Sequence, residues 1–332
     1  MYKVKPKAGA GQSVSHSRYN PRRRVSITVT FAALLLAAGL STPATAKSRN
    51  CTAAERADGD KWLWLSPSDK DYSIRRQLPW GAPVANQPSP NEILLVQRDY
   101  VNSYNTDLRV PIWSAERLDA KRLGKVKDRI NCFRADPRLT TAQASTPSDY
   151  DEPIYDQGHL SPDADQDSSK RAAVNTYIMS NMAPETCQFN RGIWQILEGI
   201  TRGWSRSKKT LYVMIGSVFD RDGDGARDPD EAAPRMVSRN GQQRVAIPSA
   251  FYRISALKRA DGSLEVLSIL LPHDTANPDG DEALSYLRDH ITTIAKIEAL
   301  TGLKLFPTAA HIEEASTLWP LAEKAPHSLC HQ

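Results

Sequence analysis

Residues 156–162 read DQGHLSP, residues 180–184 read SNMAP and residues 189–198 read FNRGIWQILE. The first stretch is a short polar turn around His159. A single histidine beside a glycine is more often structural than catalytic, so this turn alone indicates little. The third stretch begins a helical pattern that we expect to extend from about Asn190 to Arg206. Its polar residues change the interpretation of the histidine.

The expected helix carries polar side chains along one face. Four residues follow one another at a spacing of four: Asn190, Trp194, Glu198 and Arg202. Positions four apart advance only about 40° around a helix axis. An exposed helix with an ion pair between Glu198 and Arg202 is the ordinary explanation of such a face. The alternative is a site for a hard cation such as Mg²⁺, opposite a neutral histidine that could take a proton from water.

The three stretches in this order resemble the DNA/RNA non-specific endonuclease family, whose members carry a ββα-metal finger. The pattern is Asp-x-Gly-His, then Ser-Asn-x-x-Pro, then Asn-x-Gly-x-Trp-x-x-Leu-Glu. Residues 100–105, YVNSYN, are similar to an early strand of the family, and Phe306-Pro307 is similar to its close. The resemblance covers roughly residues 80–310. It implies a ββα-metal nuclease fold with a central, mostly antiparallel sheet flanked by helices.

The resemblance implies roles for three residues of the motifs. His159 would be the general base, and Asn190 would be the direct protein ligand of a catalytic Mg²⁺ or Mn²⁺. Glu198 would hold metal-bound water. His159 would then deprotonate the water that attacks phosphorus, while the metal stabilises the leaving 3′ oxygen. The rate is expected to rise through an unperturbed histidine pKa, near 6.5.

The resemblance implies further roles for polar residues around the motifs. Asn181 would help to order the site, and Arg202 would contact phosphate. Arg129, with Arg134 as its rival, would be the arginine that the family has upstream of a Phe-x-x-Asp-Pro-like segment. The family usually has arginine or lysine where this chain has Gln157, which removes one candidate phosphate contact.

With the leader described below, the resemblance implies an exported, Mg²⁺-dependent endonuclease that hydrolyses DNA, and RNA as a further substrate, without strong sequence specificity. Two rival functions stay open. The first is a non-catalytic, calcium-binding extracellular module on a nuclease-like scaffold. The second is a phosphodiesterase for small nucleotides. The preference between DNA and RNA and the oligomeric state are also open.

The secondary-structure signals indicate one α+β domain. Strand-like stretches, most with β-branched or aromatic residues, lie at 93–96, 109–115, 210–219, 244–247, 251–257 and 264–271. A second helical pattern covers 280–300 and stops at Gly302. Strands and helices do not alternate regularly. We expect a nuclease domain at 80–310, preceded by an irregular arm at 47–79 and followed by a tail at 311–332.

The first 46 residues carry the signature of a signal peptide. Arg22–Arg24 precede an apolar run that ends at Leu40, and Ala44-Thr45-Ala46 offers a cleavage site. The run is shorter than the roughly 20 residues that span a bilayer, which disfavours a membrane anchor. This leader holds seven Lys and Arg and no Asp or Glu, so the net charge of +5 becomes about −2 without it. The mature chain is therefore expected to be secreted or periplasmic, without a membrane segment, and its global charge is no argument for nucleic-acid binding.

Four cysteines lie after the leader: Cys51, Cys132, Cys187 and Cys330. An even number in an exported chain favours two disulfides over free thiols. No C-x-x-C spacing is present, which disfavours zinc. Four cysteines allow three pairings. We favour Cys51 with Cys330 and Cys132 with Cys187, because the first and last cysteines could tie down the termini.

Residues 220–231 match the calcium-loop pattern D-x-D-x-D-G-x₅-E. Five side chains could surround a structural Ca²⁺: Asp220, Asp222, Asp224, Asp228 and Glu231. The stretch follows an expected strand rather than a helix, so an acidic surface hairpin is the alternative. Another acidic run, Asp163, Asp165 and Asp167, is expected to be a solvated loop near His159.

Overall fold

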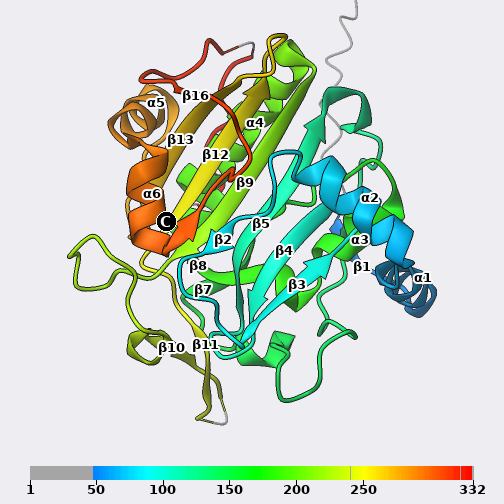
Figure 1. Ribbon diagram of the computed structural model, residues 1–332. Helices are drawn as coiled ribbons and strands as arrows, with labels where there is room; N and C mark the ends of the chain where they lie inside the picture. The colour runs from blue at the N-terminus through cyan, green and yellow to red at the C-terminus, as the bar shows by residue number, and fades with distance from the viewer. Residues whose placement is uncertain (1–47, 240, 322, 331–332) are drawn as a thin grey trace, which may run out of the picture. The chain divides into compact units, whose positions relative to one another are not determined.

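An eight-stranded sheet forms the centre of the computed structural model, which describes residues 48–239, 241–321 and 323–330 (Figure 1). The predicted signal peptide, residues 1–46, lies outside these residues. The strands are β3 (Glu92–Val96), β4 (Tyr100–Asn105), β5 (Val110–Asp119), β9 (Thr210–Val218), β12 (Ala250–Lys258), β13 (Leu264–Pro272), β14 (Ile291–Thr292) and β16 (Ile312–Glu314). Their order is β14-β13-β12-β9-β5-β4-β3, and β16 pairs with β13. Within this eight-stranded sheet, only the β13–β16 pair is parallel. The predicted α+β class with a mostly antiparallel sheet is therefore confirmed.

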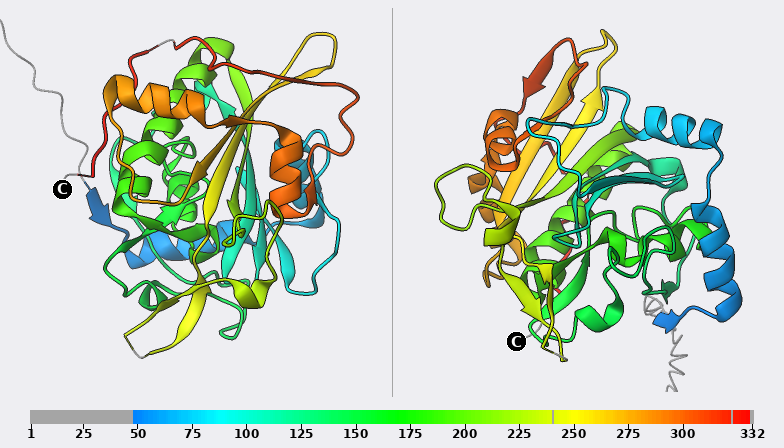
Figure 2. Two further views of the ribbon diagram at one scale, coloured as in Figure 1. Left: turned by 90° about the vertical axis from the view of Figure 1, so that its left-hand side faces the viewer. Right: turned by 60° about the horizontal axis from the view of Figure 1, so that its bottom comes forward.

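Short strand pairs and helices surround this sheet. The pairs are β1 (Ser48–Asn50) with β6 (Arg129–Asn131), β2 (Val84–Ala85) with β15 (Leu303–Lys304), β7 (Tyr155–His159) with β8 (Met182–Thr186), and β10 (Arg235–Val237) with β11 (Gln243–Ala246). The helices are α1 (Ala53–Leu63), α2 (Pro67–Gln77), α3 (Lys170–Thr176), α4 (Gln195–Lys208), α5 (Gly280–Asp289) and α6 (Ile294–Thr301). In Figure 1 and the right-hand view of Figure 2, α1 and α2 lie at one side of the sheet and α5 and α6 at the other. Among the described residues, none of the helices has the length and apolar character needed to cross a membrane.

The two faces of the sheet bury different elements, because successive side chains of a strand point to opposite faces. On β5, Glu116 accepts a hydrogen bond from the Ser161 hydroxyl in the segment after β7. The adjacent Ala115 instead borders a small cavity with Trp80. On β12, Arg253 donates a hydrogen bond to a threonine hydroxyl of α4. The face that α4 covers is therefore the face that carries the polar residues of the candidate site.

The segment 47–79, expected to be irregular, contains two helices instead. The Thr52 hydroxyl accepts a hydrogen bond from the backbone of Glu55, whose carboxylate bonds back to Thr52, and this capping box starts α1. Ser66 caps α2, and Pro67 occupies its first position. Few residues of α1 are buried. Without an apolar stripe, its sequence lacks the periodicity by which helices are usually found.

The helical pattern predicted over 280–300 forms two helices rather than one. Between α5 and α6, the β-branched pair Ile291–Thr292 forms β14 and bonds to the edge of β13. The Thr293 hydroxyl then accepts a backbone hydrogen bond and starts α6 as a new helix. α6 ends where Gly302 takes a left-handed conformation with φ 66°, in agreement with the predicted end.

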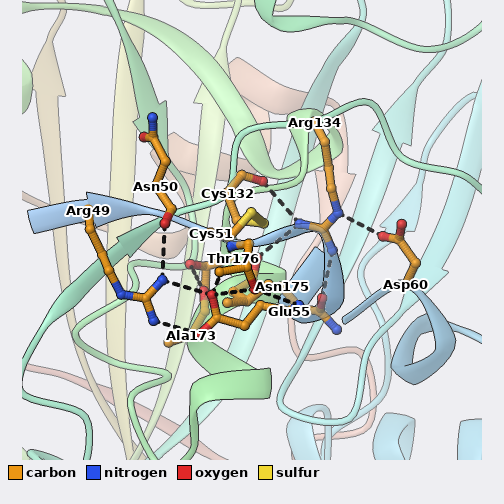
Figure 3. Close-up of a disulfide and its surroundings, with 12 residues drawn as sticks. Arg49, Asn50, Cys51, Glu55, Asp60, Cys132, Arg134, Ala173, Asn175 and Thr176 are labelled. Atoms are coloured by element: carbon orange, nitrogen blue, oxygen red, sulfur yellow. Dashed lines mark hydrogen bonds and ion pairs between the residues drawn. A yellow bond between two sulfur atoms is a disulfide. The ribbon is translucent and has the colours of Figure 1, made fainter. Parts of the chain in front are cut away.

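The disulfides join Cys51 to Cys132 and Cys187 to Cys330. The prediction of two disulfides is confirmed, but the favoured pairing is wrong. β1 pairs in parallel with β6, and this register brings the Cα atoms of Cys51 and Cys132 to 5.1 Å (Figure 3). Each of the two outer cysteines, Cys51 and Cys330, is therefore tied to an inner cysteine and not to the other outer one.

Candidate active site

A hairpin of β7 and β8 carries the histidine. The two strands are antiparallel, with Asp156 opposite Glu185 and His159 opposite Met182. A Cβ atom on Gly158 would lie 2.1 Å from the Glu185 side chain, so a larger residue would displace this buried carboxylate. Glycine at this position therefore leaves room for Glu185 beside the strand that ends in His159.

The His159 ring is nearly buried, with 8% of the residue exposed. Tyr177 and Phe133 enclose it, with ring centroids 4.8 Å and 6.0 Å away. Its Nε2 atom has no hydrogen-bond partner among the residues that the structure describes. Burial lowers the pKa of His159 from 6.5 to about 4, although Asp163 acts in the opposite direction. The ring is therefore neutral at physiological pH, as a general base must be.

Asn190 lies before a kink and not on the helix that carries Glu198. Residues 189–194 form a π-type turn, in which Gly192 has non-helical angles of φ −103° and ψ −114°. The regular helix α4 starts only at Gln195. The predicted helix is therefore too long at its start, and the spacing of four does not describe one continuous face. Turns of this type are frequent at functional sites.

The Asn190 amide is held by a carboxylate of the hairpin. Its Nδ2 donates to Asp156 Oδ2 at 3.0 Å. Arg191 makes a two-point ion pair with the same carboxylate, at 2.5 Å and 2.8 Å. With Nδ2 engaged, the Asn190 Oδ1 oxygen accepts no hydrogen bond from the described residues and stays available as a ligand. Asp156 is the first residue of the Asp-x-Gly-His motif, but the motif by itself assigned no role to it.

Glu198 and Arg202 lie one turn apart on α4. The Glu198 side chain is 12% exposed, and burial raises its pKa from 4.5 to about 7. Arg202 donates to Asp165 Oδ1 at 2.8 Å and lies 3.9 Å from the Glu198 carboxylate. Arg202 is not one of the residues that line the pocket described below. Its predicted contact with phosphate stays a prediction.

A buried ionic cluster lies on the same face of the sheet, and sequence reasoning missed it. Arg253 donates to Asp165 Oδ2 at 2.8 Å and lies 3.7 Å from Glu116 Oε1, and all three side chains are fully buried. Burial and then Asp165 raise the pKa of Glu116 well above its ordinary value. Although burial acts to raise it, the pKa of Asp165 is lowered by Arg202 and Arg253. The acidic run 163–167, expected to be solvated, therefore has its central carboxylate in the core.

Asn181 is fully buried, and its side-chain amide bonds to two backbone segments. Its Nδ2 donates to the carbonyl oxygens of Ser161 and Thr176 at 2.8 Å and 2.9 Å. Its Oδ1 accepts the backbone N–H of Ser161 at 3.1 Å. These bonds hold the segment that follows His159, a placement that suits the ordering role predicted for Asn181.

The two candidate upstream arginines have different surroundings. Arg129 is exposed on β6, with its guanidinium 5.6 Å from the centre of the Tyr177 ring, and it lines the pocket. Arg134 is buried, with Nε donating to Asp60 Oδ1 at 2.7 Å and Nη1 donating to the Cys132 carbonyl oxygen (Figure 3). Arg134 is thus occupied by structural partners. Of the two candidates, Arg129 is the one that lines the pocket.

One pocket of about 490 Å³ is lined by the predicted base, the predicted metal ligand and the predicted water-holding carboxylate: His159, Asn190 and Glu198. Asp156 and Arg191 line it as well, as does Gln157. Amide and carboxylate oxygens are the donors that Mg²⁺ and Mn²⁺ accept, so the residues present fit a hard divalent cation. The pocket therefore combines a neutral base with a donor set for a metal ion.

The candidate calcium loop brings together three of its five predicted ligands. One carboxylate oxygen from each of Asp220, Asp222 and Asp224 lies within 4.8 Å of the others. Asp228 instead accepts a backbone hydrogen bond at the start of the loop, and Glu231 is not part of the group. Calcium binding by residues 220–231 stays a prediction.

Comparison with known proteins gives consistent matches. A family model described as DNA/RNA non-specific endonuclease matches residues 82–311. The chain is 30% identical to mitochondrial endonuclease G of Homo sapiens over 214 residues, 64% of this chain and 68% of that protein. It is 30% identical to nuclease C1 of Cunninghamella echinulata var. echinulata, over 64% of this chain and 84% of that protein. The match to a venom phosphodiesterase of Macrovipera lebetinus, at 28% identity over 74% of this chain, covers only 30% of that protein.

The fold is similar to a solved structure of the EndoG/EndoGI complex. The TM-score is 0.58 at 24% sequence identity, and the match covers 75% of this chain and 98% of the other. The ββα-metal nuclease fold predicted from the motifs is confirmed.

Proposed function

The chain belongs to the DNA/RNA non-specific endonuclease family, and from this premise we propose that it is an exported, Mg²⁺-dependent endonuclease that cleaves DNA and RNA without strong sequence specificity. One observation carries the proposal. The neutral imidazole of His159 and the amide of Asn190 line the same pocket. The two disulfides support export, because such bonds persist mainly in oxidising compartments.

In this mechanism the side chains of the pocket divide the work. His159 takes a proton through Nε2 from the water that attacks phosphorus. Asn190 would hold the divalent cation through its amide oxygen, and Glu198 would hold a water molecule of that cation. When bound, the cation supplies electrostatic stabilisation of the charge that develops at the phosphate. Arg129 binds a substrate phosphate at the rim of the pocket.

The neutral Gln157 does not leave this pocket without cations. Arg191 lines the same pocket and is half exposed, with 55% of its side chain accessible. It is anchored to Asp156, the residue before Gln157. We assign to Arg191 the phosphate contact that the family usually makes from position 157. The variant Arg191→Gln removes the positive charge of this side chain. An unchanged KM for nucleic acid in this variant would contradict the assignment.

Removal of the metal is expected to abolish turnover. The mature protein should nick supercoiled plasmid in Mg²⁺ and fall to background in EDTA, and Mg²⁺ or Mn²⁺ should restore nicking. A chromogenic phosphodiester and a structured RNA serve as parallel substrates. A phosphodiesterase for small nucleotides would cleave the diester and spare the plasmid, and a non-catalytic calcium-binding module would cleave neither. Nicking at full rate after EDTA treatment would refute the proposed metal dependence.

The pH profile is expected to depend on Mg²⁺ concentration. Because the pKa of buried His159 is lowered to about 4, the base is already deprotonated well below pH 6.5. Glu198, whose pKa burial raises to about 7, gains a proton as the pH falls through 7 and then binds metal-held water less well. At low Mg²⁺, kcat/KM should therefore decrease as the pH drops below 7. At high Mg²⁺, this acidic decrease of the pH profile should begin at a lower pH.

The comparison is made by measuring kcat/KM from pH 4.5 to 9 at two Mg²⁺ concentrations. Glu198→Gln serves as the control variant, because it has no carboxylate to titrate and should lose the Mg²⁺-dependent shift. An acid limb that stays near pH 6.5 at every Mg²⁺ concentration would instead indicate an unperturbed histidine.

A further inference from the structure

The C-terminal segment Pro326–Cys330, here called the C-terminal clasp, attaches to the turn that carries Asn190 at two points. The Cys187–Cys330 disulfide ties it three residues before Asn190. The Leu329 backbone N–H donates to the Arg191 carbonyl oxygen at 2.7 Å, one residue after Asn190. The predicted metal ligand is therefore bracketed by the two attachments.

The clasp is itself anchored to the loop before α5. Asn277 Nδ2 donates to the Cys330 carbonyl oxygen at 3.1 Å, and the Ser328 hydroxyl donates to Asn277 Oδ1 at 2.8 Å. This Asn277 oxygen lies 2.5 Å from the place where a Cβ atom on Gly192 would be. Gly192 is the residue at which the π-type turn kinks. The kink and the anchored clasp thus fit together in direct contact.

The clasp also reaches the helix that carries Glu198. The Pro326 ring lies 2.5 Å from the position of a Cβ atom on Gly199, the residue that follows Glu198. Leu329 is 60% exposed and lines the same pocket as His159. The clasp therefore contacts the neighbours of both residues that we assign to the metal.

The turn that carries Asn190 is not part of the regular helix α4. Its backbone has non-helical angles at Gly192, and the regular helix begins only at Gln195. The clasp lies outside residues 82–311, the part of the chain that matches the family model. The contacts that the clasp makes with this turn therefore come from outside the part of the chain that the family model matches.

From these contacts we infer that the C-terminal clasp is a positioning element, which holds Asn190 and Glu198 in the geometry that binds the divalent cation. The inference rests on the proposed function of the pocket. Groups that orient metal ligands typically contribute about 10- to 100-fold to metal affinity or activity. The clasp would act through the backbone of residues 187–199 and would not touch substrate phosphate itself.

The test compares two variants of the mature chain that each lack one of the two disulfides. Cys187→Ser/Cys330→Ser releases the clasp, and Cys51→Ser/Cys132→Ser releases only β1. Direct Mn²⁺ binding is measured by electron paramagnetic resonance, and kcat and KM for DNA are measured against Mg²⁺ concentration. Loss of the clasp should raise the Mn²⁺ dissociation constant about 10-fold or more. The kcat at saturating Mg²⁺ should largely recover, and the β1 variant should keep its Mn²⁺ affinity within about twofold.

A second pair of variants keeps both disulfides intact. Leu329→Pro removes the N–H that donates to Arg191, while Leu329→Ala keeps it. Only the proline variant should weaken Mn²⁺ binding. Unchanged Mn²⁺ affinity in the folded clasp variants, or equal weakening in both cysteine pairs, would overturn the inference and leave the nuclease proposal standing. Absence of Mn²⁺ binding and of cleavage by the wild-type chain would overturn the proposed function instead.

Discussion

His159→Ala is expected to lower kcat by about 10²- to 10⁴-fold, the range that a positioned general base contributes. The reason is specific to this pocket. Nε2 of His159 has no hydrogen-bond partner among the described residues, and burial keeps the ring neutral by lowering its pKa to about 4. The group is therefore ready to accept a proton at neutral pH. Single-turnover cleavage of a fluorescent oligonucleotide at saturating Mg²⁺ gives the measurement.

His290→Ala is the matched control for this variant. His290 stacks on Tyr286 with ring centroids 4.1 Å apart, at the end of α5, and it does not line the pocket. Its removal should leave turnover within about twofold, since no proton of the reaction passes through it. Mn²⁺ affinity and the melting temperature are measured for both variants, so that loss of the base can be told apart from loss of the fold. Parent-like cleavage by His159→Ala would refute the assignment of the base.

Arg253→Met is expected to destabilise the protein by about 3–5 kcal/mol, the cost of removing one partner from a buried ion pair. Asp165 would keep Arg202 but would lose the cation at its second carboxylate oxygen. Glu116 would lose the only positive charge within 4 Å of it among the described residues. A methionine replaces the aliphatic part of the arginine side chain but supplies no charge. The free energy of unfolding, measured by urea denaturation, reports the loss.

Arg259→Met provides the comparison, because it makes the same chemical change just beyond the end of β12. Arg259 pairs with Glu265 and Glu313, but its side chain is 37% exposed and water can replace both partners. Its free energy of unfolding should change far less than that of Arg253→Met. Similar decreases in the free energy of unfolding of the two variants would mean that burial does not determine how much the buried ionic cluster stabilises the fold.

The chemical content of the pocket could be predicted because it lies in local motifs. His159 is the last residue of strand β7, and Glu198 lies on α4, which is a regular helix from Gln195 onward. The error at Asn190 has a physical cause. Gly192 breaks the helix with angles that no periodic pattern reports, and glycine occurs in helices without breaking them.

The buried ionic cluster of Arg253, Asp165 and Glu116 could not be predicted from the sequence, although one signal for it exists. Arg253 stands within the apolar strand-like run FYRISAL of residues 251–257. A charged residue inside such a run predicts a buried partner, because an isolated buried charge is too costly. The partner itself could not be identified, because Asp165 is 88 residues away and lies in a stretch that reads as a polar loop.

The sequence by itself determined the family and the α+β class, and it picked out the residues that we propose as base, metal ligand and carboxylate, because residue chemistry and short-range spacing suffice for these. Only the tertiary structure decided which cysteines pair, which aspartate of the 163–167 run is buried, and that the C-terminal clasp reaches the turn that carries Asn190. These features depend on contacts between segments that are far apart in the chain. Their partners are set by how the sheet and α4 pack, and local periodicity carries no record of that packing.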